Sequence, residues 1–258
     1  MPQLSAIVIT KNEAANIGAC LDSLVFCDEC IVVDCGSSDS TVEIARSKGA
    51  RVEYHEWCGD GPQRNYALSL ATGTWVLNLD ADERVTAELA AAIKAAIAEN
   101  AADAWEFPRL SNFCGRWMRH SGWYPDYVLR LFRRGKARFS DAIVHTRLSC
   151  DGVVKRLRPP LIHYAMPRLE DALLRVDRYS TAKARMIVDS GRKVSFLTGI
   201  GHGVVSFLRT YVLQAGFLDG AEGFLVAVVN AETSYYPYMK AWLATRHRKE
   251  ATLRSPAL

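Results

Sequence analysis

Three carboxylates follow a single apolar segment within four positions of the chain. The segment is "WVLNLDADERV", residues 75 to 85, and its acids are Asp80, Asp82 and Glu83. Two carboxylates one residue apart at a strand end can bind a hard divalent cation together with substrate phosphates. Alternatively, Asp82 or Glu83 caps the helix that is expected to begin near Thr86. The segment alone therefore leaves two roles for the acids, a cation site or a helix cap.

The elements around this segment predict where the acids lie. Apolar, β-branched runs indicate strands, and amphipathic patterns with cap residues indicate helices. The expected strands are residues 4–10, 30–35, 50–56 and 74–80, and the expected helices are residues 12–24, 37–49, 61–73 and 86–100. This alternation predicts a parallel α/β sheet, whose ligands bind at the C-terminal ends of its strands. The residues expected at that edge are 10–13, 34–38 and 80–83.

The composition is that of a globular, cytosolic protein. A chain of 258 residues can bury a full core, and 49% hydrophobic with 23% charged residues excludes extensive disorder. A formal charge of +4 is too weak to indicate a nucleic-acid partner. The first residues, "MPQLSAIVITKNE", are expected to form a strand and not a signal peptide. The seven cysteines have no repeating spacing, which favours reduced thiols.

The second half of the chain has a different pattern. Residues 105–165 contain short aromatic and basic segments without a long helix, and helices are expected over 169–191, 194–216 and 223–250, the last interrupted at Pro237. Residues 194–213 are long enough to span a membrane, but His202 and Arg209 interrupt them. We therefore expect an amphipathic helix that packs on the domain or lies at a membrane interface. The predicted domains are residues 1–165 and a helical extension, residues 166–258.

The order of several motifs is more specific than any one of them. "IVITKNEAANIGACLDSL", "IVVDCGSSDSTVEIA" and "QRNYALSLATGTWVLNLDADE" together resemble the family-two glycosyltransferases of GT-A type. "GWYPDYVLRLFRRGKARFSDAIVH", "HYA" and "GFLDGAEGF" are similar to the bacterial lipopolysaccharide core β-glucosyltransferases within that family. The resemblance implies a GT-A fold, which is a Rossmann-like mixed sheet flanked by helices, here with a C-terminal helical extension. It also implies an inverting enzyme that moves a sugar from a nucleotide-sugar, UDP-glucose, to a saccharide of lipopolysaccharide core or a related glycolipid.

The resemblance assigns roles to the residues at the strand ends. Thr10 and Glu13 would border the nucleotide, and Asp34 would contact the base or ribose. Arg64 would face the base or diphosphate, to which a guanidinium group is suited. Asp80 would approach the ribose and the metal, and Asp82 would ligate Mg²⁺ or Mn²⁺.

An inverting displacement requires a general base near the acceptor hydroxyl. Asp126 is the first candidate, because it lies between Glu106 and Asp141 with no other acid and is surrounded by aromatic residues. The alternative role for Asp126 is a salt bridge to a neighbouring arginine. Asp141 and His145 are the next candidates for the base.

The basic residues of the same region suggest the acceptor. They are Arg116, Arg119, Arg130, Arg133, Arg134, Lys136 and Arg138. Arginine pairs well with phosphate, so this run favours a phosphorylated or acidic saccharide, and single-stranded nucleic acid ranks low. The expected location is the cytoplasm, with peripheral contact at the cytoplasmic face of the inner membrane. Two alternatives stay open, a polyprenyl-phosphate sugar transferase of the same fold and an inactive glycan-binding protein.

Overall fold

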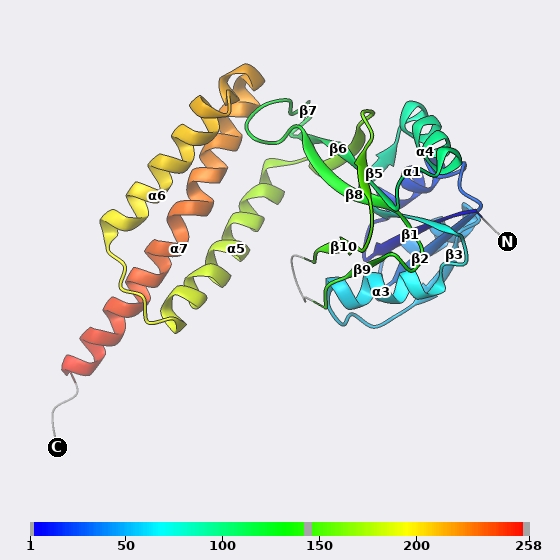
Figure 1. Cartoon of the computed structure of the whole chain (residues 1–258). Helices are drawn as coiled ribbons and strands as arrows, with labels where there is room; N and C mark the ends of the chain where they lie inside the picture. The colour runs from blue at the N-terminus through cyan, green and yellow to red at the C-terminus, as the bar shows by residue number, and fades with distance from the viewer. Residues whose placement is uncertain (1–2, 142–145, 255–258) are drawn as a thin grey trace. The chain divides into compact units, whose positions relative to one another are not determined.

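The computed structural model describes residues 3–141 and 146–254, with side chains up to Arg246. Its contacts divide the chain into two compact units (Figure 1). Unit 1 contains Met1–Leu110 and Pro125–Tyr164, and unit 2 contains Ser111–Tyr124 and Ala165–Leu258. The sequence suggests a boundary near residue 165, and the structure in addition groups residues 111–124 with the C-terminal helices.

A mixed sheet forms the centre of unit 1. The strands are β1 (Leu4–Thr10), β2 (Glu29–Asp34), β3 (Arg51–Tyr54), β4 (Trp75–Asp80), β5 (Glu83–Val85), β6 (Ala104–Phe113), β7 (Arg116–Trp117), β8 (Asp126–Arg133), β9 (Ala137–Phe139), β10 (Leu148–Cys150), β11 (Val154–Arg156) and β12 (Leu161–Met166). Of these, β9 and β10 form a separate two-stranded sheet, and the residues of β7 belong to unit 2. The order across the sheet is β3-β2-β1-β4-β8-β6-β12-β5. Strands β3, β2, β1 and β4 are parallel, whereas β8 joins β4 in antiparallel orientation. The sheet is therefore mixed, as the resemblance implied.

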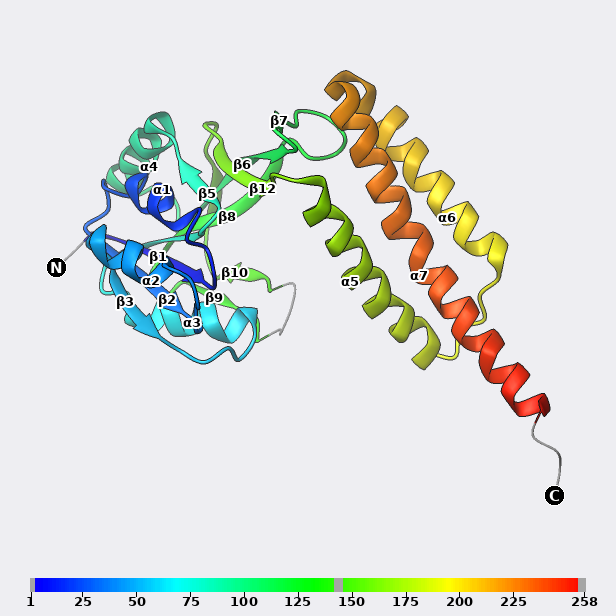
Figure 2. The same cartoon turned by 180° about the vertical axis from the view of Figure 1, so that it is seen from behind.

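Helices cover both faces of this sheet. They are α1 (Ile17–Asp22), α2 (Thr41–Ser47), α3 (Asp60–Leu70) and α4 (Ala87–Glu99). Leu21 of α1, Ala45 of α2 and Ile93 of α4 belong to one apolar core, whereas Ala67 of α3 belongs to the core of the opposite face. Figure 1 shows α1 and α4 on one side of the sheet and α3 on the other, and Figure 2 shows α2 from behind.

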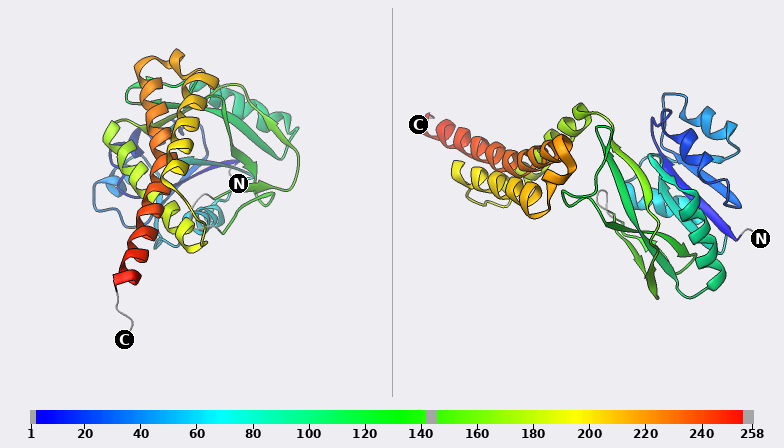
Figure 3. Two further views of the ribbon diagram at one scale, coloured as in Figure 1. Left: turned by 90° about the vertical axis from the view of Figure 1, so that its left-hand side faces the viewer. Right: turned by 90° about the horizontal axis from the view of Figure 1, so that it is seen from above.

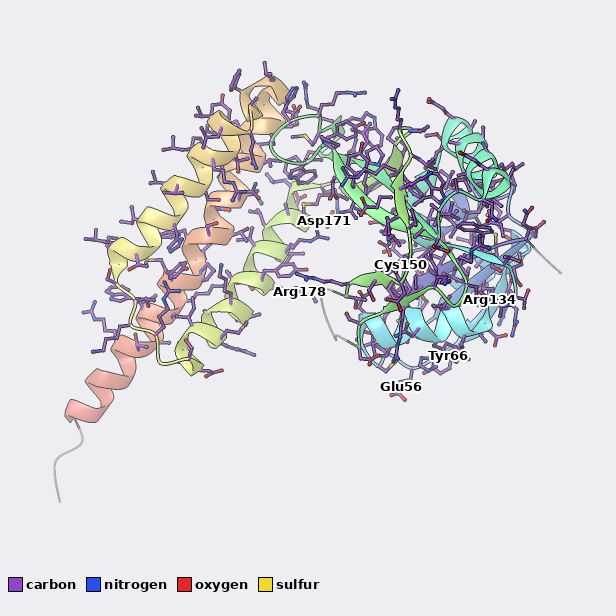
Figure 4. The ribbon with its side chains drawn as sticks, viewed as in Figure 1. Glu56, Tyr66, Arg134, Cys150, Asp171 and Arg178 are labelled. Carbon is purple, nitrogen blue, oxygen red and sulfur yellow. The ribbon has the colours of Figure 1, made fainter. Side chains whose placement is uncertain are left out.

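The loop after β3 fixes α3, which carries one of the predicted site residues. The ring of His55 stacks on Tyr66 with ring centroids 3.9 Å apart. His55 Nδ1 also lies 2.8 Å from Oε1 of the buried Gln63. Figure 4 labels Tyr66 and the neighbouring loop residue Glu56 on the α3 side of unit 1.

Unit 2 is built around three helices. They are α5 (Leu169–Asp189), α6 (Phe196–Leu208) and α7 (Gly220–Arg254), with a π-helical turn η1 (Arg209–Leu213) and a 3₁₀ turn η2 (Gly216–Asp219) between the last two. Helices α5 and α6 each pack along α7 (Figure 3). The expected interruption at Pro237 is wrong, because α7 runs through this residue. A proline inside a helix costs about 3 kcal/mol, and the burial of Tyr238 and Met239 against neighbouring helices offsets this cost.

Asp219 ties residues 111–124 to the turn between α6 and α7. Its side chain is buried and accepts hydrogen bonds from the backbone N–H groups of Arg119 (3.1 Å) and His120 (2.9 Å). The Ser121 hydroxyl donates a further bond of 3.2 Å. Charged hydrogen bonds inside a protein are among the strongest, so this turn and the 111–124 segment are joined within unit 2.

Candidate active site

The register of the parallel strands brings the predicted acids to one edge of the sheet. Thr10 at the end of β1 lies opposite Asp34 of β2. On the other side of β1, Ile9 lies opposite Asp80 of β4. The C-terminal ends of three strands therefore meet, as the alternation of strands and helices predicted.

Asp80 is held between two arginines. Its Oδ1 accepts a hydrogen bond of 2.7 Å from Arg64 Nη2, and its Oδ2 accepts one of 2.6 Å from Arg130 Nη2. Burial alone would raise the pKa of the Asp80 carboxyl, but Arg130 and Arg64 outweigh burial and hold this pKa far below its usual range. Asp80 is therefore ionised, and both of its oxygens are bonded to guanidinium groups.

Arg64 lies within the same cluster. Its Nη1 donates to Asn78 Oδ1 at 3.2 Å, and its Nε donates to Asp60 at 3.0 Å. With a side chain only 12% exposed, Arg64 is fixed by these bonds and by Asp80. These contacts place Arg64 beside Asp80 at the edge of the sheet.

Glu83 is the most buried acid of the cluster. It is fully buried, and Arg130 Nη2 donates to it at 2.5 Å while the Asp80 N–H donates at 3.0 Å. Burial raises the pKa of Glu83, with Arg130 opposing the rise and Asp80 adding to it. Arg130 thus bridges the carboxylates of Asp80 and Glu83.

The alternative that Asp82 or Glu83 caps the following helix is wrong. Helix α4 begins at Ala87, and its cap is Thr86, whose side chain accepts the N–H of Leu89 at 3.1 Å. Asp80 accepts hydrogen bonds from Arg64 of α3 and Arg130 of β8, and Glu83 accepts one from Arg130.

Asp82 lies next to a histidine, whereas Asp80 and Glu83 are bonded to arginines. Strand β12 pairs with β5 and places His163 opposite Glu83. His163 Nε2 then lies 3.4 Å from Asp82 Oδ2, and the Tyr164 N–H donates to the Asp82 carbonyl at 2.9 Å. The side chain of Asp82 is 29% exposed, so its carboxylate can contact a ligand at the edge of the sheet.

The chemistry of this pair fits a divalent cation with substrate phosphates. Among residues 3–141 and 146–254 no cluster of three or more His, Cys, Asp or Glu side chains could hold a metal ion. Mg²⁺ and Mn²⁺ sites for nucleotides need fewer protein ligands, because phosphates and water complete the shell. Asp82 has a carboxylate oxygen, the donor that suits Mg²⁺ and Mn²⁺, and His163 has an imidazole nitrogen, a common metal ligand in proteins.

Asp126 is joined to this cluster through Arg109. Arg109 Nη2 and Nε donate to Asp126 Oδ2 at 2.6 and 3.0 Å. Arg109 Nη1 also lies 3.6 Å from Glu83 Oε1. The salt bridge considered for Asp126 therefore exists, and it connects the 42%-exposed carboxylate of Asp126 to the buried acids.

The remaining predicted residues of the nucleotide side are also near strand ends. Thr10 is buried, and within the described part of the chain its Oγ1 has no hydrogen-bond partner. Asp34 is buried and accepts the N–H groups of Gly36 and Ser37, both at 2.9 Å. Glu13 accepts a bond from Asn16 at 2.8 Å, and burial raises its pKa against the effect of this bond.

Among the described residues, Asp141 has no contact with this cluster. Asp141 is exposed and lies 3.4 Å from Arg138 Nη2, at a shallow pocket that Asn65 and Ser69 of α3 also line. His145 lies outside the described residues.

Three arginines of the basic run have partners within unit 1. Arg130 is buried between Asp80 and Glu83, and Arg133 lies 3.6 Å from Asp103. Arg134 Nε donates to the Gly73 carbonyl at 3.0 Å. The segment "YVLRLF" places Arg130 within an apolar strand. A charge at such a position needs a buried partner of opposite charge, so the segment itself indicates that Arg130 is paired.

The sequence named Glu83 only as a possible cation ligand or helix cap, and Arg130 only within the basic run. It did not single out Arg109 or His163. All four lie within the contacts described above, yet their partners are 20 or more positions away in most cases. Such pairs cannot be predicted from spacing along one strand or helix.

Comparison with known proteins identifies the family. The model of glycosyl transferase family 2 matches residues 5–158, which contain Asp80, Asp82, Glu83 and Asp126. This chain belongs to glycosyltransferase family 2. The predicted family and the GT-A arrangement of unit 1, a mixed sheet between helices, are thereby confirmed.

Relatives extend the likeness beyond unit 1 of this glycosyltransferase. Lipopolysaccharide core biosynthesis glycosyltransferase LpsC of Rhizobium meliloti (strain 1021) is 32% identical, over 96% of this chain and 94% of that protein. An uncharacterized glycosyltransferase of Rickettsia felis is 28% identical over 100% of this chain and 95% of that protein. Among solved structures, S. aureus TarS 1–349 in complex with UDP-GlcNAc is 17% identical, with a TM-score of 0.49, over 96% of this chain and 92% of that chain.

Proposed function

We propose that this glycosyltransferase moves a hexose from UDP-glucose to a saccharide of lipopolysaccharide core or a related glycolipid, with inversion and with a divalent cation. The observation that carries the proposal is the difference between two neighbouring acids. Asp80 has both oxygens bonded to arginines, whereas Asp82 presents a partly exposed carboxylate beside His163. The relative LpsC, which is named for lipopolysaccharide core biosynthesis, supports the acceptor class.

Asp82 and His163 would hold Mg²⁺ or Mn²⁺. Asp80 would fix Arg64 and Arg130 at the edge of the sheet where the nucleotide would bind. When bound, the cation would neutralise charge on the departing nucleoside diphosphate. Thr10, Glu13, Asp34 and Arg64 would border the nucleotide. The Arg130 bridge keeps Asp80 ionised and fixed, so that the donor meets a preorganised edge.

Asp126 would act as the general base. Its carboxylate would accept the proton of the acceptor hydroxyl while the hydroxyl oxygen attacks the anomeric carbon and the nucleoside diphosphate leaves. Arg109 donates two bonds to Oδ2 of Asp126, which fixes the direction of the carboxylate. Asp141 and His145 remain the next candidates. A glycolipid acceptor would place the protein at the cytoplasmic face of the inner membrane.

Calorimetry with UDP-, GDP- and CDP-sugars, each with and without Mn²⁺, tests the donor and the cation. We expect Mn²⁺-dependent binding of UDP-glucose that Asp82→Asn weakens at least about 10-fold, the equivalent of one lost charge contact. Asp22→Asn is the matched control, because Asp22 is an exposed acid paired with Lys48. Equal, metal-independent binding by wild type and Asp82→Asn would overturn the cation site.

Transfer assays test the acceptor and the base. Core oligosaccharide lipid and polyprenyl phosphate are offered in parallel, and NMR of the product identifies the new anomeric linkage. Transfer to polyprenyl phosphate alone would overturn the proposed acceptor. Asp126→Asn should lower kcat by two or more orders of magnitude while donor binding is kept.

A further inference from the structure

Helix α6 is oriented with its apolar face toward solvent. Its buried positions are the small residues Gly199 and Gly203. A Cβ atom at Gly199 would lie 2.4 Å from the Met239 side chain, and one at Gly203 would lie 3.2 Å from Tyr235 Cβ, both on α7. Two glycines one turn apart thus bring α6 close to the backbone of α7, a type of packing common among helices in membranes.

The outward face forms a continuous row of large apolar side chains, the apolar stripe. It consists of Leu197, Ile200, Val204, Val205, Leu208, Val212 and Leu213. Within α6, Leu197, Ile200, Val204 and Leu208 recur at the three- and four-residue spacing of one helical face. The exposed Val212 and Leu213 follow in the π-helical turn η1. Leu197 is 73% exposed, Val205 65% and Leu213 81%. A soluble helix buries such a face in its core, so this row indicates an interaction surface.

The charge of unit 2 distinguishes between two possible partners of the stripe, a second copy of the chain and an anionic lipid bilayer. The sequence of unit 2 contains 15 Lys and Arg against 8 Asp and Glu, whereas unit 1 contains 17 against 20. Arg192 and Lys193 precede α6, and Arg209 follows it, all of them exposed. Further exposed cations come from α5, such as Arg178, which Figure 4 labels. Two copies facing each other would bring like charges together, whereas anionic lipid head groups complement them.

The length and composition of α6 would also allow a membrane span. Among the described helices, one passes this test, over Phe196–Leu213 with a mean hydropathy of 1.2, and 17% of that window is buried. The turn at its end is bonded through Asp219 to Arg119, His120 and Ser121. A spanning α6 would carry this turn, with the basic 111–124 segment attached, into or across the bilayer. Contact in the plane of the interface avoids that cost.

We propose that the apolar stripe of α6 and η1 inserts into the surface of an anionic lipid bilayer, parallel to the membrane plane. Arg192, Lys193 and Arg209 contact the lipid head groups while the stripe enters the acyl boundary. This inference deepens the membrane contact of the proposed function. It rests on unit 2 alone, and its test involves neither donor nor acceptor, so the two proposals can fail separately.

Cosedimentation of the full chain with vesicles tests the stripe. Vesicles of phosphatidylcholine with phosphatidylglycerol are compared with phosphatidylcholine alone. We expect tighter binding to the anionic vesicles, and about 10-fold or greater weakening for each of Leu197→Glu, Val205→Glu and Leu213→Glu, because each large aliphatic side chain contributes that much when buried. Val25→Glu is the matched control, because Val25 is an exposed valine of unit 1.

A charge reversal tests the proposed contact between the basic residues and the lipid head groups. Lys193→Glu should weaken binding to anionic vesicles about 5-fold or more, whereas Lys155→Glu, at an exposed position of unit 1, should not. Circular dichroism and thermal unfolding verify that each variant is folded. Binding of the stripe variants equal to that of wild type, or no binding of wild type to anionic vesicles, would overturn the proposal. So would a dimer seen by light scattering without lipid that the stripe variants abolish.

Discussion

Replacement of Arg130 by methionine removes the central cation of the site. Arg130 is 8% exposed, and its Nη2 lies 2.6 Å from Asp80 and 2.5 Å from Glu83. Methionine conserves much of the volume but leaves two carboxylates facing each other at a buried position. Breaking a buried ion pair in this way costs about 3–5 kcal/mol. For a chain of this size, the melting temperature should fall by about 6–20 °C.

The assay is urea and thermal unfolding followed by circular dichroism. Arg133→Met is the matched control on the same strand, because Arg133 is partly exposed and pairs with Asp103 at 3.6 Å; it should cost at most about 1 kcal/mol. The double variant Arg130→Met with Glu83→Gln should recover part of the loss, because one of the two facing charges is removed.

The pH dependence gives an independent check of the same reasoning. Without Arg130, the pKa of Asp80 loses the main effect that lowers it in the folded protein. A carboxyl whose pKa is higher folded than unfolded gains stability as the pH falls. The deficit of Arg130→Met relative to wild type should therefore shrink between pH 7 and pH 5. A loss below 1 kcal/mol that does not change with pH would refute the buried-charge explanation.

Two further predictions concern packing and a buried thiol. Gly61→Ala should destabilise the fold by about 1–3 kcal/mol, because its Cβ would lie 1.7 Å from the Ser140 carbonyl oxygen. Gly201→Ala in α6, with no atom within 4 Å of the added Cβ, should be neutral or stabilise by up to about 1 kcal/mol; equal chemical-denaturation results for both variants would contradict this. Burial raises the pKa of Cys20 from 9.0 to about 12, so the stability that this thiol contributes is intact below pH 9 and declines as the pH rises toward 12. Wild type should thus lose about 1.4 kcal/mol more than Cys20→Ala between pH 8 and pH 10 in urea unfolding, and parallel pH profiles would disprove it.

Local patterns were sufficient to predict the first half of the fold. The runs "LSAIVIT" and "TWVLNLD" are apolar enough to form central strands, and the register confirms that they are neighbours. Pro237 shows the limit of local rules. Its ring disfavours a helix interior, but tertiary packing around Tyr238 and Met239 keeps α7 continuous.

The candidate site was predictable only where it depends on strand ends. Asp34, Asp80 and Asp82 each follow an apolar strand, and parallel strands bring such ends together. Arg130 and His163 could not be predicted in the same way, because their partners come from strands distant in sequence. Asp126 illustrates the difference, since the sequence left its salt bridge open and the structure supplied Arg109.

The sequence by itself determined the family, the α/β sheet and the edge at which its acids meet, because these depend on periodicity and on motifs of a few residues. The tertiary structure decided which acids are bonded to arginines and which acid has a partly exposed carboxylate that can contact a ligand. Asp80 and Glu83 receive arginine from α3 and β8, while β12 places His163 beside Asp82. It likewise decided that the apolar face of α6 points outward, because glycines, and not leucines, face α7. Periodicity gives a helix its two faces, but only the partner helix determines which face is buried.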